Sequence, residues 1–239
     1  MWVLALDTTT RDGGVALVRD GVVAAARPGD AGLTHAERVP SDIRALLDEA
    51  GVSLAAVDVI AVATGPGGFT GLRIGIAAAH GLAAALCRPA VGVPALTALA
   101  WDLLDRMPDQ AVAGAWLDAS RGEVFAAACV RPGPEAPAWP PDELVPATAA
   151  TPDVTLASWA AVPAGTPVAA VGPDALRERL EAAGLRPVPP AGSLAAVVGR
   201  IAWQMAGRGP IDPASLAPVY VRRPDAELER ERRTAAERA

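Results

Sequence analysis

Hydrophobic and polar residues along the first half of the chain follow a pattern that predicts alternating strands and helices. Short continuous apolar runs predict buried strands, whereas apolar residues three to four positions apart predict the buried face of a helix. Asp20-Gly21 is typical of a two-residue hairpin turn, and Thr34 with Glu37 forms a capping box at a helix start. The pattern predicts strands over 2–7, 13–19, 22–27, 57–63 and 90–93, and helices over 35–50, 71–86 and 95–106.

The second half begins with a similar pattern. Leu6–Val15 and Leu117–Val124 both lead from a strand through an aspartate, hydroxyl-bearing residues, an arginine and a glycine into another strand. Such a match arises easily in an alanine-rich chain, so these residues leave an internal duplication and a chance similarity equally open. Five prolines predict an irregular surface segment over 131–142, since proline cannot donate a hydrogen bond within a sheet. The remaining predicted elements are strands over 111–118 and 123–130, and helices over 173–184 and 193–206.

Composition narrows the class of protein. Hydrophobic residues make up 51% of the 239 residues, which excludes a disordered chain in spite of 23 glycines and 23 prolines. The formal net charge is −6, and every basic residue is an arginine. Because the net charge is negative, we do not expect the chain to bind a nucleic acid through its own electrostatic attraction. Cys87 and Cys129 form no Cys-x-x-Cys pair and are predicted to be small apolar core residues.

The chain shows no pattern typical of export or of a membrane protein. Its N-terminus is apolar but lacks basic residues and reaches Asp7 too early for a signal peptide. The apolar run between Arg73 and Arg88 has 14 residues, fewer than the roughly 18 that span a bilayer. We therefore expect a soluble cytoplasmic protein that does not associate with a membrane.

A glycine-rich loop over 65–71 precedes the second predicted helix. Its glycines permit close backbone approaches, and backbone amides at a helix start can hold an anion. No lysine follows, so the loop is not a Walker A motif, and a tight structural turn is the favoured interpretation. The helix carries small residues at a spacing of four, which indicate either packing on the sheet or a helix–helix interface: Gly71, Gly75, Ala79 and Ala83.

Two aspartates at predicted strand ends are candidates for phosphate or Mg²⁺ chemistry. Asp7 is followed by Thr8 and Thr9, and Asp118 is followed by Ser120. Carboxylates beside hydroxyl groups suit sites that hold a phosphate or hydrated Mg²⁺. The alternative, which these residue types alone favour, is that both aspartates cap turns.

Other catalytic chemistry has little support in the sequence. His35 and His80 are 45 residues apart and form no local metal-binding pair. No Gly-x-Ser-x-Gly nucleophile motif occurs. We therefore predict no metal site and no catalytic residue.

The stretch 65–75 with its continuation closely resembles the signature of the TsaB family, also called YeaZ. The family pattern is near Gly-Pro-Gly-Ser-Phe-Thr-Gly-Leu-Arg-Ile-Gly, and this chain departs from it with Gly68 in place of serine and His80 in place of a following lysine. Weaker matches follow in the family's order at 4–9, 35–37, 91–96, 117–125 and 218–222. Together they span nearly the whole chain.

The resemblance implies an α/β fold of two ribonuclease-H-like lobes, as in the actin, sugar-kinase and Hsp70 (ASKHA) superfamily. It divides the chain into an N-terminal lobe over 1–106, a C-terminal lobe over 107–221 and a charged tail over 222–239. The implied function is that of a non-catalytic subunit. It supports the TsaD enzyme in N6-threonylcarbamoylation of the adenosine beside the anticodon of tRNAs reading ANN codons.

The resemblance also implies partners and a surface. TsaD would bind directly and TsaE would join the complex, tRNA would be contacted only through the complex, and the isolated chain would form a homodimer. The chain would hold no cofactor of its own, because ATP and a metal ion belong to the partner subunits. The implied partner interface comprises His35, Val39, Ile43, Gly71, Arg73, Gly75, Ala79, His80 and Ala83.

Two enzymatic alternatives to the subunit role stay open. Asp7, Thr8, Thr9 and Asp118 would form a nucleotide or phosphate site in a small ASKHA-type phosphotransferase. An M22-like peptidase is the other alternative, because related sequences carry that label.

Overall fold

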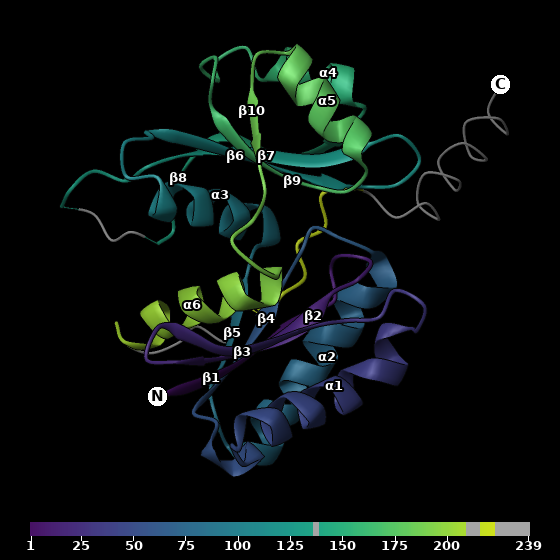
Figure 1. Cartoon of the computed structure of the whole chain (residues 1–239), viewed down its shortest axis with the longest axis vertical. Coiled ribbons are helices and arrows are strands. Elements are labelled where there is room, and N and C mark those ends of the chain that lie inside the picture. The colour runs from purple at the N-terminus through teal and green to yellow at the C-terminus, as the bar shows by residue number, and fades with distance from the viewer. Residues whose placement is uncertain (136–138, 209–215, 223–239) are drawn as a thin grey trace, which may run out of the picture.

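The first of two mixed five-stranded sheets is formed by the N-terminal part of the chain (Figure 1). The computed structural model describes residues 1–135, 139–208 and 216–222. The strand order is β3-β2-β1-β4-β5, with β2 antiparallel to β1 and β3, and with β4 and β5 parallel to β1. The strands are β1 (Trp2–Asp7), β2 (Gly14–Arg19), β3 (Val22–Pro28), β4 (Val59–Ala63) and β5 (Ala90–Val93).

The second sheet repeats this topology. Its order is β10-β9-β6-β7-β8, with β7 antiparallel to β6 and β8, and with β9 and β10 parallel to β6. Counted from the β8 edge, the order and directions equal those of the first sheet, so the two lobes share one fold. The strands are β6 (Val112–Asp118), β7 (Val124–Val130), β8 (Asp142–Ala150), β9 (Pro167–Val171) and β10 (Arg186–Val188).

Helices cover both faces of each sheet. Helices α1 and α2 pack on the outer face of the first sheet, and α4 and α5 pack on the outer face of the second. Between the sheets, α3 and α6 contact each other (Figure 1). The helices are α1 (His35–Ala50), α2 (Phe69–Leu86), α3 (Ala95–Arg106), α4 (Pro152–Ser158), α5 (Asp174–Ala182) and α6 (Leu194–Ala206), with a short 3-10 turn at Leu54–Ala56.

The two central helices change the division of the chain that the sequence suggested. Helix α3 packs on β6, β7 and β9 of the second sheet, whereas α6 packs on β1, β2 and β4 of the first. Gly199 makes the second contact possible, because a Cβ there would lie 2.7 Å from Val18 Cγ2. The ranges 1–106 and 107–221 therefore do not correspond to separate packing units. Most of the expected tail, 223–239, lies outside the described residues.

Several elements of the second half differ from the prediction. No strand was predicted over 142–150, where the structure has β8. Pro146 is tolerated within β8 because this strand lies at the sheet edge. The proline-rich segment is not simply surface, since Trp139 is only 7% exposed and packs edge-on against Trp101 at 6.5 Å between ring centroids. The elements α4, β9 and β10 were also missed.

The two cysteines lie in different environments. Cys129 is buried on β7, as predicted. The prediction for Cys87 was wrong, because it is exposed at the C-terminal cap of α2 with a left-handed φ of 52°.

Candidate functional site

The Asp7 carboxylate is engaged within its own turn at the end of β1. One oxygen accepts hydrogen bonds from the Thr9 backbone N–H at 2.8 Å and the Thr9 hydroxyl at 2.6 Å, and the other accepts from the Thr10 hydroxyl at 2.7 Å. Asp7 is 2% exposed. The turn-capping interpretation of Asp7 agrees with this geometry.

Glycines of the loop and of α2 pack directly on this turn. A Cβ on Gly67 would lie 2.4 Å from the Thr9 carbonyl oxygen, and one on Gly71 would lie 2.2 Å from the Thr8 carbonyl oxygen. A Cβ on Gly75 would lie 2.1 Å from Thr8 Oγ1. These glycines allow the loop and α2 to pack closely on the turn, because a side chain at any of the three positions would collide with Thr8 or Thr9.

The same packing corrects part of the predicted partner interface. Gly71, Gly75 and Ala79 are buried against the Asp7 turn and β4, so this ridge faces into the lobe. Val39 and Ile43 are 3% and 7% exposed and belong to the core between α1 and the sheet. These five residues are not available to a partner.

His35 is half-buried between α1 and α2. Its Nδ1 lies 2.8 Å from Arg38 Nη2, and its ring contacts the Gly71 position. Burial and then the Arg38 charge lower the pKa of His35, while Asp7 and the Thr10 backbone oppose the shift. His35 therefore favours its neutral form and links the helices within the lobe.

The exposed side of α2 lies opposite the buried glycine ridge. Arg73 and His80, two residues of the implied interface, are exposed, and Ala83 is half-buried. We define the outer face of α2 as Arg73, Ala77, His80, Gly81 and Ala84, all exposed and all spaced to share one side of the helix.

This face is unusually apolar for a helix in contact with solvent. Arg73 is the only formally charged residue of α2, and a Cβ on Gly81 would meet open space. Helix α1 beside it exposes Glu37, Arg44 and Asp48, as an ordinary solvent-facing helix does. With 18 residues, α2 is long and apolar enough to cross a membrane by length and composition alone, a property that core helices of soluble proteins share.

The Asp118 turn is open where the Asp7 turn is closed. Asp118 is exposed, and one of its carboxylate oxygens accepts a hydrogen bond from the Ser120 N–H at 2.9 Å. Ser120 and Arg121 both adopt left-handed φ angles, of 60° and 58°, which L-residues seldom adopt. The turn borders a cleft of about 480 Å³ between the lobes, whose lining includes Gly67, Phe69, Asp118, Arg121, Tyr220 and Arg222.

A C-terminal strap, defined as residues 216–222, crosses beside this cleft and contacts both lobes. The Val219 N–H donates to the Thr64 carbonyl at 2.8 Å, and Arg73 Nε donates to the Tyr220 hydroxyl at 3.0 Å. The Arg73 guanidinium also lies 3.7 Å from the Phe69 ring centroid. On the other lobe, Arg222 forms an ion pair with Glu123.

The chain is similar to proteins of tRNA threonylcarbamoyladenosine biosynthesis. Residues 19–133 match the family model of TsaD, described as tRNA N6-adenosine threonylcarbamoyltransferase. The Escherichia coli protein named tRNA threonylcarbamoyladenosine biosynthesis protein TsaB is 37% identical over 128 residues, which cover 52% of this chain and 53% of that protein. The chain thus spans about half the length of this curated relative.

A solved structure aligns over almost the whole chain. It is a Pseudomonas aeruginosa protein described as similar to peptidase YEAZ, with 30% identity, a TM-score of 0.69, and coverage of 92% of this chain and 99% of that one. The chain belongs to the TsaB/YeaZ family. This membership confirms the predicted family.

The fold class of this TsaB/YeaZ member is also confirmed. Component A of (R)-2-hydroxyglutaryl-CoA dehydratase from Acidaminococcus fermentans aligns with a TM-score of 0.55 over 87% of this chain. Its sequence identity is 9%, so this likeness shows the fold alone. The two sheets of equal topology agree with a two-lobed ASKHA fold.

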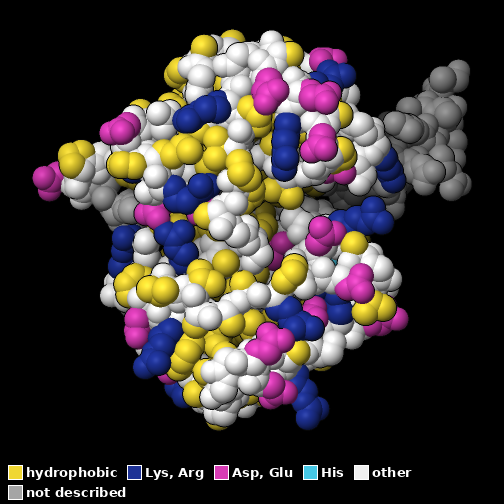
Figure 2. Space-filling view, in the orientation of Figure 1, with side chains coloured by type: hydrophobic (Ala, Val, Ile, Leu, Met, Phe, Trp, Pro, Cys, Tyr) yellow, Lys and Arg dark blue, Asp and Glu magenta, His cyan; other side chains and the backbone are white. Residues whose placement is uncertain are grey.

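Charges on the viewed face of this TsaB/YeaZ member are mixed rather than clustered. Figure 2 shows Arg and acidic side chains dispersed over both lobes, with hydrophobic side chains gathered in the band between them. Within the described residues, no group of three or more His, Cys, Asp or Glu side chains could hold a metal ion.

Of the predicted interface residues on α2, Gly71, Gly75 and Ala79 lie on its buried side. The glycine spacing drew attention to the buried ridge, whereas Ala77, Gly81 and Ala84 repeat small residues on the exposed side. The strap residues Tyr220 and Arg222 were noted only as a family motif. Their contact with Phe69 and Glu123 joins segments about 100 residues or more apart, which no local pattern encodes.

Proposed function

We propose that this TsaB/YeaZ member is a non-catalytic subunit that binds a TsaD homologue. In that complex it supports N6-threonylcarbamoylation of the adenosine beside the anticodon of tRNAs reading ANN codons. The observation that carries the proposal is the outer face of α2, an exposed helix surface with a single charged residue. An apolar surface of this kind on a folded domain is typical of a protein–protein contact.

Small side chains suit this face to a second helix. Ala77, Gly81 and Ala84 project little from α2, so a partner helix can approach its backbone closely. Arg73 and His80 flank them with polar groups that can hydrogen-bond at the rim. The face therefore fits an apolar partner helix of small residues.

A TsaD homologue meets this description better than an unrelated protein. The matched TsaD model covers residues 19–133, which include α1 and α2, so a TsaD homologue would present a similar helix pair. Two similar surfaces can associate about an approximate two-fold axis. The same face would support a homodimer of the isolated chain.

A supporting rather than catalytic role agrees with the Asp7 turn. Three hydrogen bonds engage its carboxylate, and glycines of α2 occupy the space above Thr8 and Thr9. The phosphotransferase alternative, which needed Asp7 for a nucleotide, is not favoured. ATP, the metal ion and tRNA contact are assigned to the partners, with TsaE as the further subunit.

The test replaces Ala84 on the outer face by arginine and uses Ala175→Arg as the matched control. Ala175 is exposed on α5 of the other lobe, so its variant carries the same added charge away from the proposed interface. In cells that lack this gene, we expect wild type and Ala175→Arg to restore threonylcarbamoyladenosine in tRNA, and Ala84→Arg to fail. Unchanged tRNA modification after gene deletion would refute the proposed function.

A further inference from the structure

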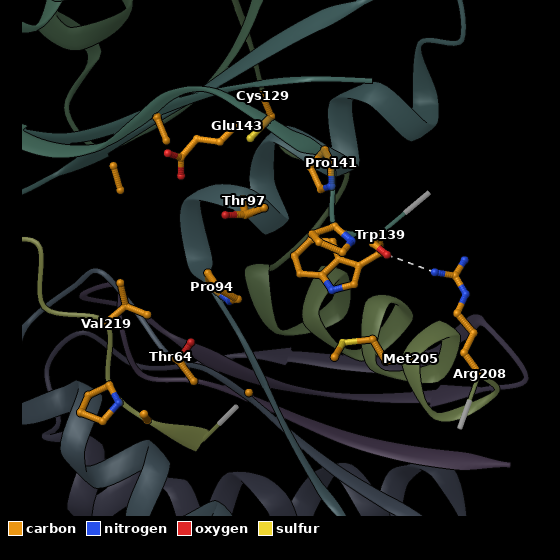
Figure 3. Close-up of a pocket in the computed structure, with 16 residues that line it drawn as sticks. Thr64, Pro94, Thr97, Cys129, Trp139, Pro141, Glu143, Met205, Arg208 and Val219 are labelled. Atoms are coloured by element: carbon orange, nitrogen blue, oxygen red, sulfur yellow. Dashed lines mark hydrogen bonds between the residues drawn. The ribbon is translucent and has the colours of Figure 1, made fainter. Parts of the chain in front are cut away.

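A cavity of about 750 Å³ lies between the lobes, bordered on one side by the strap. It is formed by the ends of β4 and α3, by strands β7 and β8, by the Trp139–Pro141 segment and by the end of α6 (Figure 3). Its volume is in the range of small-molecule binding sites. The Asp7 turn does not line it.

Its walls are mostly apolar and held in place. Pro94, Pro141, Met205 and Val219 contribute apolar surface, and Trp139 closes one end (Figure 3). Trp139 is fixed by its edge-on contact with Trp101 and by a hydrogen bond from Arg208 Nη1 to its carbonyl at 3.1 Å. The Trp139 side chain therefore needs little reorganisation to contact a ligand.

The charge in this cavity is negative at the end away from Arg208. Glu143 is directed into it beside Cys129 and Thr97 (Figure 3). Burial, together with the Glu143 charge, raises the pKa of Cys129 to about 12, so the thiol stays neutral near pH 7. Glu143 is itself exposed, and among the described residues that line the cavity Glu143 and Arg208 are the charged ones.

The segments next to the cavity in the sequence contain no positive charge that could pair with the Glu143 carboxylate. Residues 136–138, next to Trp139, are Ala-Pro-Ala, and residues 209–215, after Arg208, contain no arginine or lysine. Arg208 itself is directed at the Trp139 carbonyl, at the opposite end from Glu143 (Figure 3). A carboxylate beside apolar and aromatic walls is complementary to a cation with an apolar body.

We propose that this cavity binds a small organic cation, in which an ammonium group near Glu143 is attached to an aromatic or branched aliphatic body that packs against Trp139 and Met205. This site is independent of the outer face of α2, so either proposal can fail without the other.

The experiment titrates the full chain with 2-phenylethylamine and with the uncharged 2-phenylethanol as probes. Binding is followed by NMR through the Trp139 indole N–H, which a Trp139→Phe variant assigns. We expect the amine to bind about fivefold more tightly than the alcohol, because an exposed ion pair contributes about 1 kcal/mol. Glu143→Gln should remove this preference and leave alcohol binding unchanged.

Asp142→Asn is the matched control. Asp142 precedes Glu143 on the same strand and does not line the cavity, so its variant should keep the preference for the amine. Thermal melting without probe shows whether each variant is folded. Equal binding of amine and alcohol to wild type, a preference that survives Glu143→Gln, or no Trp139 shift with either probe would overturn the proposal.

Discussion

The two lobes place an aspartate at the same point of the same topology and use it differently. Asp7 pairs with Gly14 and Asp118 pairs with Val124, each at the end of the central strand of its sheet. Asp7 is buried and accepts three hydrogen bonds within its turn. Asp118 is exposed and, within the described residues, accepts a hydrogen bond from the Ser120 N–H. Equivalent positions in the fold therefore do not imply equivalent chemistry.

The difference arises from the helix that follows the next parallel strand. In the first lobe β4 leads into α2, an 18-residue helix whose glycines pack on the Asp7 turn. In the second lobe β9 leads into α5, a nine-residue helix in which Leu180 is the buried residue. Gly172, before α5, also lies against Asp118, since a Cβ there would be 2.9 Å from Asp118 Cβ, but the Asp118 side chain stays exposed. The first lobe closes its turn with a glycine-bearing helix, and the opposite side of that helix is exposed.

The largest loss of stability should come from adding a methyl group to α2 where this helix packs on the Asp7 turn. Gly71→Ala would place a Cβ 2.2 Å from the Thr8 carbonyl oxygen, a backbone atom that cannot move aside without distorting the Asp7 turn. We expect a loss of about 2–4 kcal/mol in the free energy of unfolding, measured by urea denaturation. Gly81→Ala on the same helix should instead be neutral or stabilise by up to about 1 kcal/mol, since its site is open. Equal effects would contradict the packing account.

The second-largest difference in stability between the two lobes should appear when each aspartate is replaced by alanine. Asp7→Ala leaves the Thr9 and Thr10 donors without their acceptor in a buried turn, and we expect a loss of about 2–3 kcal/mol in unfolding free energy. Asp118→Ala should cost about 0.5 kcal/mol or less because water replaces its contact. A comparable cost at both positions would remove the distinction between a closed and an open turn.

The strap should contribute less to the free energy of unfolding than either of these sites. Arg222→Ala removes the ion pair with Glu123 and the contact of its guanidinium with Phe125, which lies 5.6 Å from the ring centroid. We expect a loss of about 1 kcal/mol in unfolding stability and faster proteolysis between the lobes. Arg177→Ala, which removes only the exposed pair with Asp174, is the control and should change neither measurement. An unaltered Arg222→Ala protein would show that the strap does not hold the lobes together.

The smallest expected effect is a pH dependence at His35. Its pKa is lowered in the folded state, so the unfolded chain binds more protons and stability falls as the pH drops below about 6.5. Solvent screening limits this contribution to about 0.5 kcal/mol or less. Urea denaturation of wild type and His35→Gln at pH 7.5 and 5.5 measures it, and the variant should lose less stability between these pH values. An identical loss in both proteins would exclude His35 as the source.

Local patterns in the sequence predicted the first lobe well. The capping box at Thr34 and Glu37 is present, and the Asp20-Gly21 hairpin joins β2 to β3 as expected. These features depend on residues close together in the chain, where propensity and capping act directly. In the second lobe, β8 contains Pro146 and β10 has only three residues, so neither has a local pattern typical of a strand.

Long-range packing could not be predicted from those patterns. The exchange of α3 and α6 between the sheets depends on contacts such as Gly199 against Val18, between opposite ends of the chain. The same holds for the orientation of α2, because a ridge of small residues indicates close packing without indicating what packs there. Arginine at Gly75 or Ala79 would therefore disrupt the core rather than report on a partner.

We propose that the outer face of α2 binds a TsaD homologue. Calorimetric titration of the purified TsaD homologue with wild type, Ala84→Arg and Ala175→Arg measures this interaction. We predict that Ala84→Arg weakens binding about 100-fold, or about 2.7 kcal/mol, because it inserts a charge into an apolar contact, whereas Ala175→Arg binds as wild type does. Unaltered affinity of a folded Ala84→Arg variant, or no binding by wild type, would contradict the account.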